Sequence, residues 1–123
     1  MHKTDACCTL VPYFQINDGQ VEAFKALGPQ FVARTRTEPG CVHYAFSYNG
    51  SQAHCREGYD NAEALLAHLD NVGALLGEAL KIASLVRLEV HGPAAELAKL
   101  HGPMTALNPQ YFELADGIRR QTY

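Results

Sequence analysis

Residues 42–59 read VHYAFSYNGSQAHCREGY, and this stretch decides the fold. Two alternating runs flank Asn49-Gly50, and Asn-Gly between such runs predicts a β-hairpin, because a type I′ turn needs positive φ at both central positions. With Asn49-Gly50 as the loop, the predicted pairs are Tyr48 with Ser51, Phe46 with Ala53, Tyr44 with Cys55 and Val42 with Glu57. A four-residue loop is the alternative, and it keeps the same pairing frame.

The hairpin has two faces of different character, because side chains alternate across a strand. The first face is large and aromatic and holds Val42, Tyr44, Phe46, Tyr48, Ala53, Cys55, Glu57 and Tyr59. The second is small and mixed and holds Cys41, His43, Ala45, Ser47, Gln52, His54 and Arg56. We expect the aromatic face to lie against helices.

The chain before the hairpin predicts a strand and a helix. The strand covers residues 6–14, and Pro12 inside it indicates either an edge position or a bulge. The helix runs from about Gln20 to Thr35, with Asn17 as its N-cap. Gly28-Pro29 falls in the middle of this helix and is expected to kink it or loosen one turn.

The chain after the hairpin continues the alternation of helices and strands. Asp60 or Asn61 caps a second helix, whose apolar stripe has helical spacing and which is expected to bend or end near Asn71. Three further elements are a strand over 81–91, a short helix over 94–100 and a strand over 111–115. In the strand over 81–91, one predicted face holds Ser84, Val86, Leu88 and Val90, and the other holds Leu85, Arg87, Glu89 and His91.

The predicted order is β-α-β-β-α-β, which is a ferredoxin-like α+β sandwich with an antiparallel sheet. We expect a single domain over residues 1–123, with a core at about 6–91 and an extension at 92–123 formed by the short helix and the last strand. The second sheet face is expected to carry Cys41, His43, Ala45, Arg56, Arg87 and Glu89. A single copy would leave this face exposed, so we predict a two-fold homodimer through it.

The bulk properties exclude several classes of protein. The chain has 123 residues, of which 47% are hydrophobic, and a net charge of −3. Nucleic-acid binding is not expected, because that affinity comes largely from neutralising phosphates. No stretch approaches the roughly 20 apolar residues of a membrane span. The polar N-terminus lacks a signal-peptide core, so the four cysteines indicate reduced thiols in a cytoplasmic protein.

Two segments resemble the antibiotic biosynthesis monooxygenase domain. TRTEPGCVHY at 35–44 resembles its helix-to-strand signature, and residues 57–69, which include Glu57-Gly58-Tyr59 and His68, resemble its second half. The resemblance covers about residues 6–91 and implies a small dimeric α+β barrel. The family includes cofactor-free oxygenases of anthrones and quinols and haem-degrading members. This chain departs from the family in having Tyr59 where tryptophan is frequent, and Asn71-Val72-Gly73 where a further histidine is common.

The resemblance implies a site on the aromatic face of the hairpin. A cofactor-free oxygenase needs a base that deprotonates a phenol or quinol, donors for the resulting oxyanion and an aromatic enclosure. The base would be His68, oriented by Glu57. The residues expected to hold the substrate are Tyr44, Tyr59, Asn71 and Tyr48, with Cys55 facing the pocket. No metal is expected, because the histidines lack metal-ligand spacing and Cys-x-x-Cys is absent.

The sequence therefore predicts a monooxygenase without a bound cofactor, acting with dioxygen on a small aromatic or quinol-type molecule. The first alternative is a haem-binding or haem-degrading protein. The second is a non-catalytic binding module, in which Glu57 and His68 form only a structural hydrogen bond and aromatic side chains fill the pocket. A haem titration followed by absorbance tests the first alternative. The volume of the cavity beside His68 separates the binding module from the enzymes, and the segment 92–108 is a candidate lid over that cavity.

Overall fold

A single sheet with helices on one face forms the fold, described here for residues 5–120 of a computed structural model. The elements are β1 (Cys8–Ile16), α1 (Val21–Thr35), β2 (Cys41–Asn49), β3 (Gln52–Tyr59), α2 (Ala62–Ala79), β4 (Ala83–Gly92), α3 (Ala94–Leu100), the 3-10 turn η1 (Thr105–Leu107) and β5 (Gln110–Glu113). The strand order is β2-β3-β1-β4-β5, and the first four strands pair antiparallel. This arrangement confirms the ferredoxin-like fold. The added strand β5 pairs parallel to β4.

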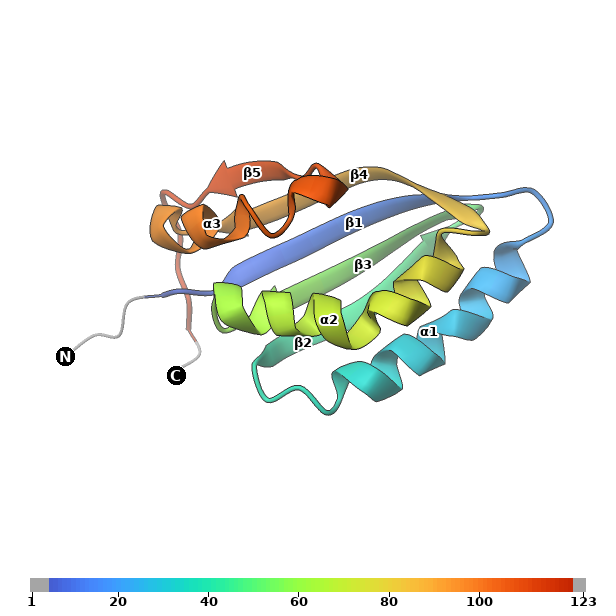
Figure 1. Cartoon of the computed structure of the whole chain (residues 1–123), viewed down its shortest axis with the longest axis horizontal. Helices are drawn as coiled ribbons and strands as arrows, with labels where there is room; N and C mark the ends of the chain where they lie inside the picture. The colour runs from blue at the N-terminus through green and yellow to red at the C-terminus, as the bar shows by residue number, and fades with distance from the viewer. Residues whose placement is uncertain (1–4, 121–123) are drawn as a thin grey trace.

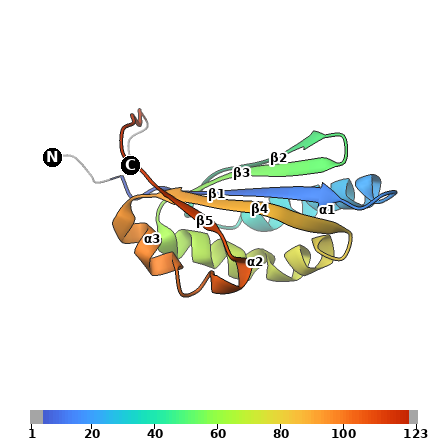
Figure 2. The same cartoon turned by 90° about the horizontal axis from the view of Figure 1, so that it is seen from above.

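The layers place one sheet face against the helices and leave the other open. Figure 1 shows α1 and α2 side by side across the sheet, with α3 near the β4–β5 end. Figure 2 shows that all three helices lie on the same side. Within residues 5–120, no helix covers the second sheet face.

The β2–β3 hairpin forms, but its register differs from the predicted one. Asn49 pairs with Gln52, and Tyr44 pairs with Glu57 instead of Cys55. The loop is therefore Gly50-Ser51, and Gly50 has φ +59. Glycine at the first central position is the type II′ arrangement, which needs only one residue with positive φ. Because the shift is two residues, Tyr44, Cys55 and Glu57 keep the same face.

Two β-bulges reverse parts of the predicted faces. The β2–β3 register shifts between Cys41 and His43, so Cys41 packs against the core while Val42 is 37% exposed, the opposite of the prediction. The β1–β4 register shifts between Tyr13 and Phe14, and Val86 is 63% exposed. An extra residue in one strand moves the following side chains to the other face.

Pro12 lies in a central strand, so its predicted edge position is wrong. It pairs with Leu88 of β4, next to the bulge that was the alternative explanation. On its other side, the β1–β3 pairing has no partner at Val11 or Pro12, in keeping with the missing N–H of proline.

The helix ends agree only in part with the prediction. The N-cap of α1 is Gln20, without a side-chain cap bond, so Asn17 is not the N-cap. Helix α1 continues through Pro29. In α2, the Asn61 side chain accepts a hydrogen bond from the Ala64 backbone N–H at 2.9 Å, which confirms that cap. Helix α2 runs past Asn71, because its later turns bury the apolar residues Val72, Leu75 and Ala79.

The C-terminal extension packs onto the core at the start of α2. Leu97, Leu100 and Met104 join the core cluster that contains residues of β1, β4 and α2. The buried Glu96 side chain accepts a hydrogen bond from the backbone N–H of Ala62 at 2.9 Å. It thereby satisfies one of the free N–H groups at the start of α2. Helix α3 thus fixes the end of the helix that carries His68.

Gly40 holds the start of β2 against the first turn of α2. A Cβ added at Gly40 would lie 2.6 Å from the Cβ of Ala64. We expect Gly40→Ala to destabilise the fold by about 1–3 kcal/mol through overpacking, measured by urea unfolding. Ala64→Gly in the same chain should recover part of the loss. Gly77→Ala, in open space on α2, serves as the control and should not destabilise; an equal loss there would contradict the explanation.

Candidate active site

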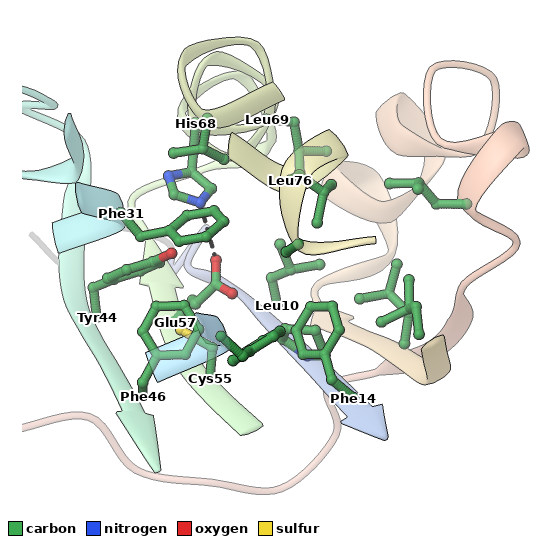
Figure 3. Close-up of a pocket in the computed structure, with 17 residues that line it drawn as sticks. Leu10, Phe14, Phe31, Tyr44, Phe46, Cys55, Glu57, His68, Leu69 and Leu76 are labelled. Carbon is green, nitrogen blue, oxygen red and sulfur yellow. Dashed lines mark ion pairs between the residues drawn. The ribbon is translucent and has the colours of Figure 1, made fainter. Parts of the chain in front are cut away.

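Two elements bring an imidazole and a carboxylate together inside the fold. His68 of α2 is 2% exposed, and its Nε2 lies 3.3 Å from Oε1 of Glu57 on β3. Figure 3 shows the His68 ring pointing from α2 toward the Glu57 carboxylate on the sheet. The Tyr59 hydroxyl donates a hydrogen bond of 2.6 Å to the same Glu57 oxygen. The second oxygen of Glu57 is therefore the one left for other partners.

A second carboxylate approaches the other side of the imidazole. His68 Nδ1 lies 2.9 Å and 3.1 Å from the two oxygens of Glu38, in the turn between α1 and β2. Asn71 donates to Glu38 at 2.8 Å and to the backbone carbonyl of Arg34 at 2.9 Å, which fixes the turn to α2. An ionised carboxylate only accepts hydrogen bonds. Both ring nitrogens of His68 therefore carry a proton when both bonds are made.

Burial and the neighbouring carboxylates shift the pKa of His68 in opposite directions. Burial alone would lower the pKa of His68, but the Glu57 carboxylate, and after it the Glu38 carboxylate, favour the protonated ring. Together they raise the pKa of His68 above its ordinary value. The three groups thus form an alternating carboxylate–imidazolium–carboxylate cluster, with the positive charge in the centre.

This raised pKa predicts a pH dependence of stability. A group whose pKa is higher in the folded state stabilises the fold fully below its unfolded pKa, about 6.5 for histidine, and less as the pH rises through the folded value. We therefore expect the urea midpoint to fall between about pH 6 and pH 8. His68→Gln should remove this slope. A slope that persists in His68→Gln would show that another group is responsible.

The cavity beside Glu57 is small and largely apolar. Its volume is about 40 Å³, room for a few water-sized molecules or one dioxygen. It is lined by Leu10, Pro12, Phe14, Phe24, Phe31, Tyr44, Phe46, Cys55, Glu57, His68, Leu69, Val72, Leu76, Ala79, Leu85, Leu88 and Leu107. Figure 3 shows Phe31, Tyr44 and Phe46 on one side of the carboxylate and leucines on the other. A benzene-sized ring needs roughly 150 Å³, so it enters only if side chains move.

The hydroxyl and thiol groups in this wall stay protonated at neutral pH. Burial raises the pKa of Tyr44 far above its usual range, and the Glu57 carboxylate raises it further. Burial and the same carboxylate raise the pKa of the Cys55 thiol. Tyr44 is therefore available as a hydrogen-bond donor, while Cys55 is not a thiolate nucleophile.

Four of the five predicted substrate-binding residues divide into two groups. Tyr44 and Cys55 line the cavity with Glu57 and His68. Tyr59 is fully buried behind the carboxylate and lies outside the cavity lining. Asn71 lies behind the imidazole, on Glu38. These two therefore position Glu57 and Glu38 from outside the cavity.

Tyr48 is placed elsewhere by the fold. Its ring packs edge-on against Phe24, and Lys25 Nζ lies 5.1 Å from the ring centre. It lines a separate surface hollow near the end of the hairpin, together with Asn49 and Gln52. The position of Tyr48 in the hairpin puts it four residues beyond Tyr44, too far along the strand to reach the cavity.

Glu38 is the site residue that the sequence analysis did not predict. It lies 30 positions before His68, within the segment TRTEPGCVHY at 35–44. The available signal was its place in the same signature that carries Tyr44. The Pro39-Gly40 turn folds the acidic side chain back toward α2.

The geometry of His68 does not suit haem ligation. Both ring nitrogens point at carboxylate oxygens, so neither is free to bind iron. The cavity of about 40 Å³ is also far smaller than a macrocycle. Among residues 5–120, no cluster of three His, Cys, Asp or Glu side chains is arranged to hold a metal ion.

Comparisons with known proteins place the chain in a family. A family model described as antibiotic biosynthesis monooxygenase matches residues 8–75, more than half of the chain. The chain therefore belongs to the antibiotic biosynthesis monooxygenase family, and the matched range includes Glu38, Glu57 and His68. A comparison with curated proteins gave no match.

Solved structures share the fold of this chain. The chain is 50% identical to MupZ from Pseudomonas fluorescens, with a TM-score of 0.89, over 93% of this chain and 94% of that one. It is 21% identical to Rv0793 from Mycobacterium tuberculosis, with a TM-score of 0.63, over 71% of this chain and 94% of that one. The second likeness shows the shared fold alone. Within residues 5–120, no helix has the length and apolar character needed to span a membrane.

Proposed function

We propose that the protein is a cofactor-free monooxygenase in which the Glu57 carboxylate removes a proton from a small quinol-type molecule. The observation that supports this most directly is the pairing of Glu57 with His68 at the wall of an apolar cavity. A charged imidazole beside the carboxylate orients it, and the apolar wall strengthens the electrostatics of the step. His68, predicted as the base, instead positions Glu57, because its two nitrogens already face carboxylates.

The reaction follows from the proton transfer. Glu57 takes a proton from an acidic C–H or O–H bond, and the electron-rich anion passes one electron to dioxygen. The two radicals combine to form a C–O bond, and a proton returns to the peroxide as water leaves. A methylene group and dioxygen thus give a carbonyl and water. Tyr44, the donor in the cavity wall, would stabilise the substrate oxyanion.

The substrate must enlarge the cavity. Tyr44 lies between the cavity and a surface cleft of about 340 Å³, because it lines both. A rotation of the Tyr44 ring would join the two spaces and give room for one or two rings. Leu107 of η1 closes another part of the wall, so the 92–108 segment contributes to the lid. These movements also distinguish the enzyme from the non-catalytic binding module, whose cavity would stay closed.

A second candidate is a proton-transfer reaction that uses no dioxygen. It is favoured by the aliphatic part of the wall, which suits an aliphatic molecule as well as a ring: Leu10, Leu69, Val72, Leu76, Leu85 and Leu88. Glu57, positioned by His68, would then take a proton from one atom of the substrate and return it to another in an isomerisation or elimination.

An oxygen electrode distinguishes the two candidates. Wild-type protein is mixed with anthrone and with substituted hydroquinones, and dioxygen uptake is recorded above the uncatalysed rate. Uptake that saturates with substrate supports the monooxygenase. Substrate that binds and is converted with no dioxygen uptake favours the second candidate, and no binding of any ring compound contradicts both the enlarged cavity and the quinol substrate.

We also propose that two copies associate through the open sheet face. The exposed apolar side chains Val86 and Phe112 lie on β4 and β5, and Arg87 pairs with Glu89 on the same sheet. Sedimentation equilibrium measures the mass: twice the chain mass supports the homodimer, and a monomer at all concentrations contradicts it.

A further inference from the structure

Glu38 connects the buried imidazole to the surface. It lines the cleft of about 340 Å³ together with Val32, Thr35, Arg36, Cys41, Val42 and Tyr44. Its side chain is 10% exposed, whereas those of His68 and Glu57 are 2% and 4% exposed. The cleft therefore reaches one end of the cluster, and the cavity reaches the other.

The three groups form an unbroken line of close polar contacts. Glu38 lies 2.9 Å from Nδ1 of His68, and Nε2 of the same ring lies 3.3 Å from Glu57. Imidazole can accept a proton on one nitrogen and release one from the other. Each contact is within the reach of direct proton transfer or slightly beyond it.

We propose that Glu38, His68 and Glu57 form a proton relay between the cavity and the solvent in the surface cleft. In the outward direction, the relay starts from the neutral ring with its proton on Nδ1. Glu57 passes the proton that it has taken to Nε2, which gives the doubly protonated ring, and the Nδ1 proton then moves to Glu38. Glu38 then passes its proton to water in the cleft. The net result of these steps is that one proton moves from the cavity to the solvent and Glu57 is ionised again. The reverse sequence delivers a proton to the cavity.

The surroundings of His68 restrict the alternatives for this path. The titratable groups that face the ring are Glu38 from the α1–β2 turn, Glu57 and Tyr59 from β3, and Tyr44 from β2. Burial, followed by the Glu57 charge, raises the pKa of Tyr59 far above its usual range. Tyr59 therefore holds its proton, and among the groups facing the ring Glu38 is the carboxylate that also reaches the cleft.

The relay rests on the proposed function only in taking Glu57 as the base. Its test needs no substrate. We would label the histidines with ¹⁵N and measure by NMR how fast the ring N–H protons of His68 exchange with water. A relay through Glu38 predicts that Glu38→Gln slows this exchange at least about tenfold, since one acid–base group contributes roughly 10²–10⁴ to such a transfer. Glu78→Gln, an exposed change on the same helix, should leave the rate unchanged.

Two further variants separate the relay from loss of structure. Glu38→Asp keeps a carboxylate and should exchange faster than Glu38→Gln. Val42→Trp fills the cleft without removing an ionisable group, and the 37% exposure of Val42 makes this change tolerable. It should also slow exchange. Exchange that stays at the wild-type rate in both Glu38→Gln and Val42→Trp would overturn the relay. The role of Glu57 as the base is tested separately, by measuring turnover of the substrate.

Discussion

Glu57→Gln is expected to lower kcat by about 10²–10⁴, because the amide cannot accept the substrate proton. The amide oxygen of glutamine can still accept the hydrogen bonds that Tyr59 and His68 give to Glu57 in the wild type. The fold and the affinity for the substrate should therefore change little. The measurement is initial-rate kinetics with the substrate that shows the highest dioxygen uptake.

The matched control for this variant is Glu78→Gln, which makes the same chemical change at an exposed position. It should keep the wild-type kcat. If Glu57→Gln raised KM but left kcat intact, Glu57 would bind the substrate without taking its proton. That result would end the assignment of Glu57 as the base.

His68→Phe is expected to be the most destabilising single change in the site. Removing the imidazolium leaves the Glu38 and Glu57 carboxylates buried without their shared counter-charge. Breaking a buried ion pair by removing one partner costs about 3–5 kcal/mol. The free energy of unfolding, measured in urea at pH 6, should fall by this amount. It should fall by less at pH 8, because above the unfolded histidine pKa of about 6.5 the raised pKa of His68 stabilises the wild type less.

The control is a variant of His68→Phe that also lacks the two buried carboxylate charges. Glu38→Gln and Glu57→Gln added to His68→Phe remove both buried charges, so this triple variant should be more stable than His68→Phe alone. If the triple variant were equally unstable, the loss would come from packing around the ring and not from unpaired charge. In that case the alternating cluster would have no electrostatic role in the fold.

The fold was predictable because local signals agreed with one another. The Asn49-Gly50 turn, the Asn61 cap and the alternating runs all indicated the same order of elements. The errors arose where the backbone departs from regular geometry. Bulges at Val42 and Val86 reverse the alternation. The first has no signal in the sequence, whereas Pro12 on the paired strand indicated the second as one of two alternatives.

The site could be predicted only from the resemblance to the family. The Glu57–His68 contact was expected, and the structure has it at 3.3 Å. Glu38 was missed, because a contact between positions 30 residues apart depends on how the α1–β2 turn meets α2. Tyr59 and Asn71 lie close to the cluster around His68, as expected, but their side chains do not line the cavity. Periodicity assigns a face to a residue, and burial decides which side chains reach the open space.

The central claim is that Glu57 takes a proton from the substrate, and hydrogen exchange without dioxygen measures this step alone. Anthrone is incubated anaerobically in deuterium oxide with wild-type protein, and NMR follows the loss of its acidic C–H signal against a sample without protein. The account predicts faster exchange with the wild type and background exchange with Glu57→Gln. Equal exchange with both proteins would contradict it.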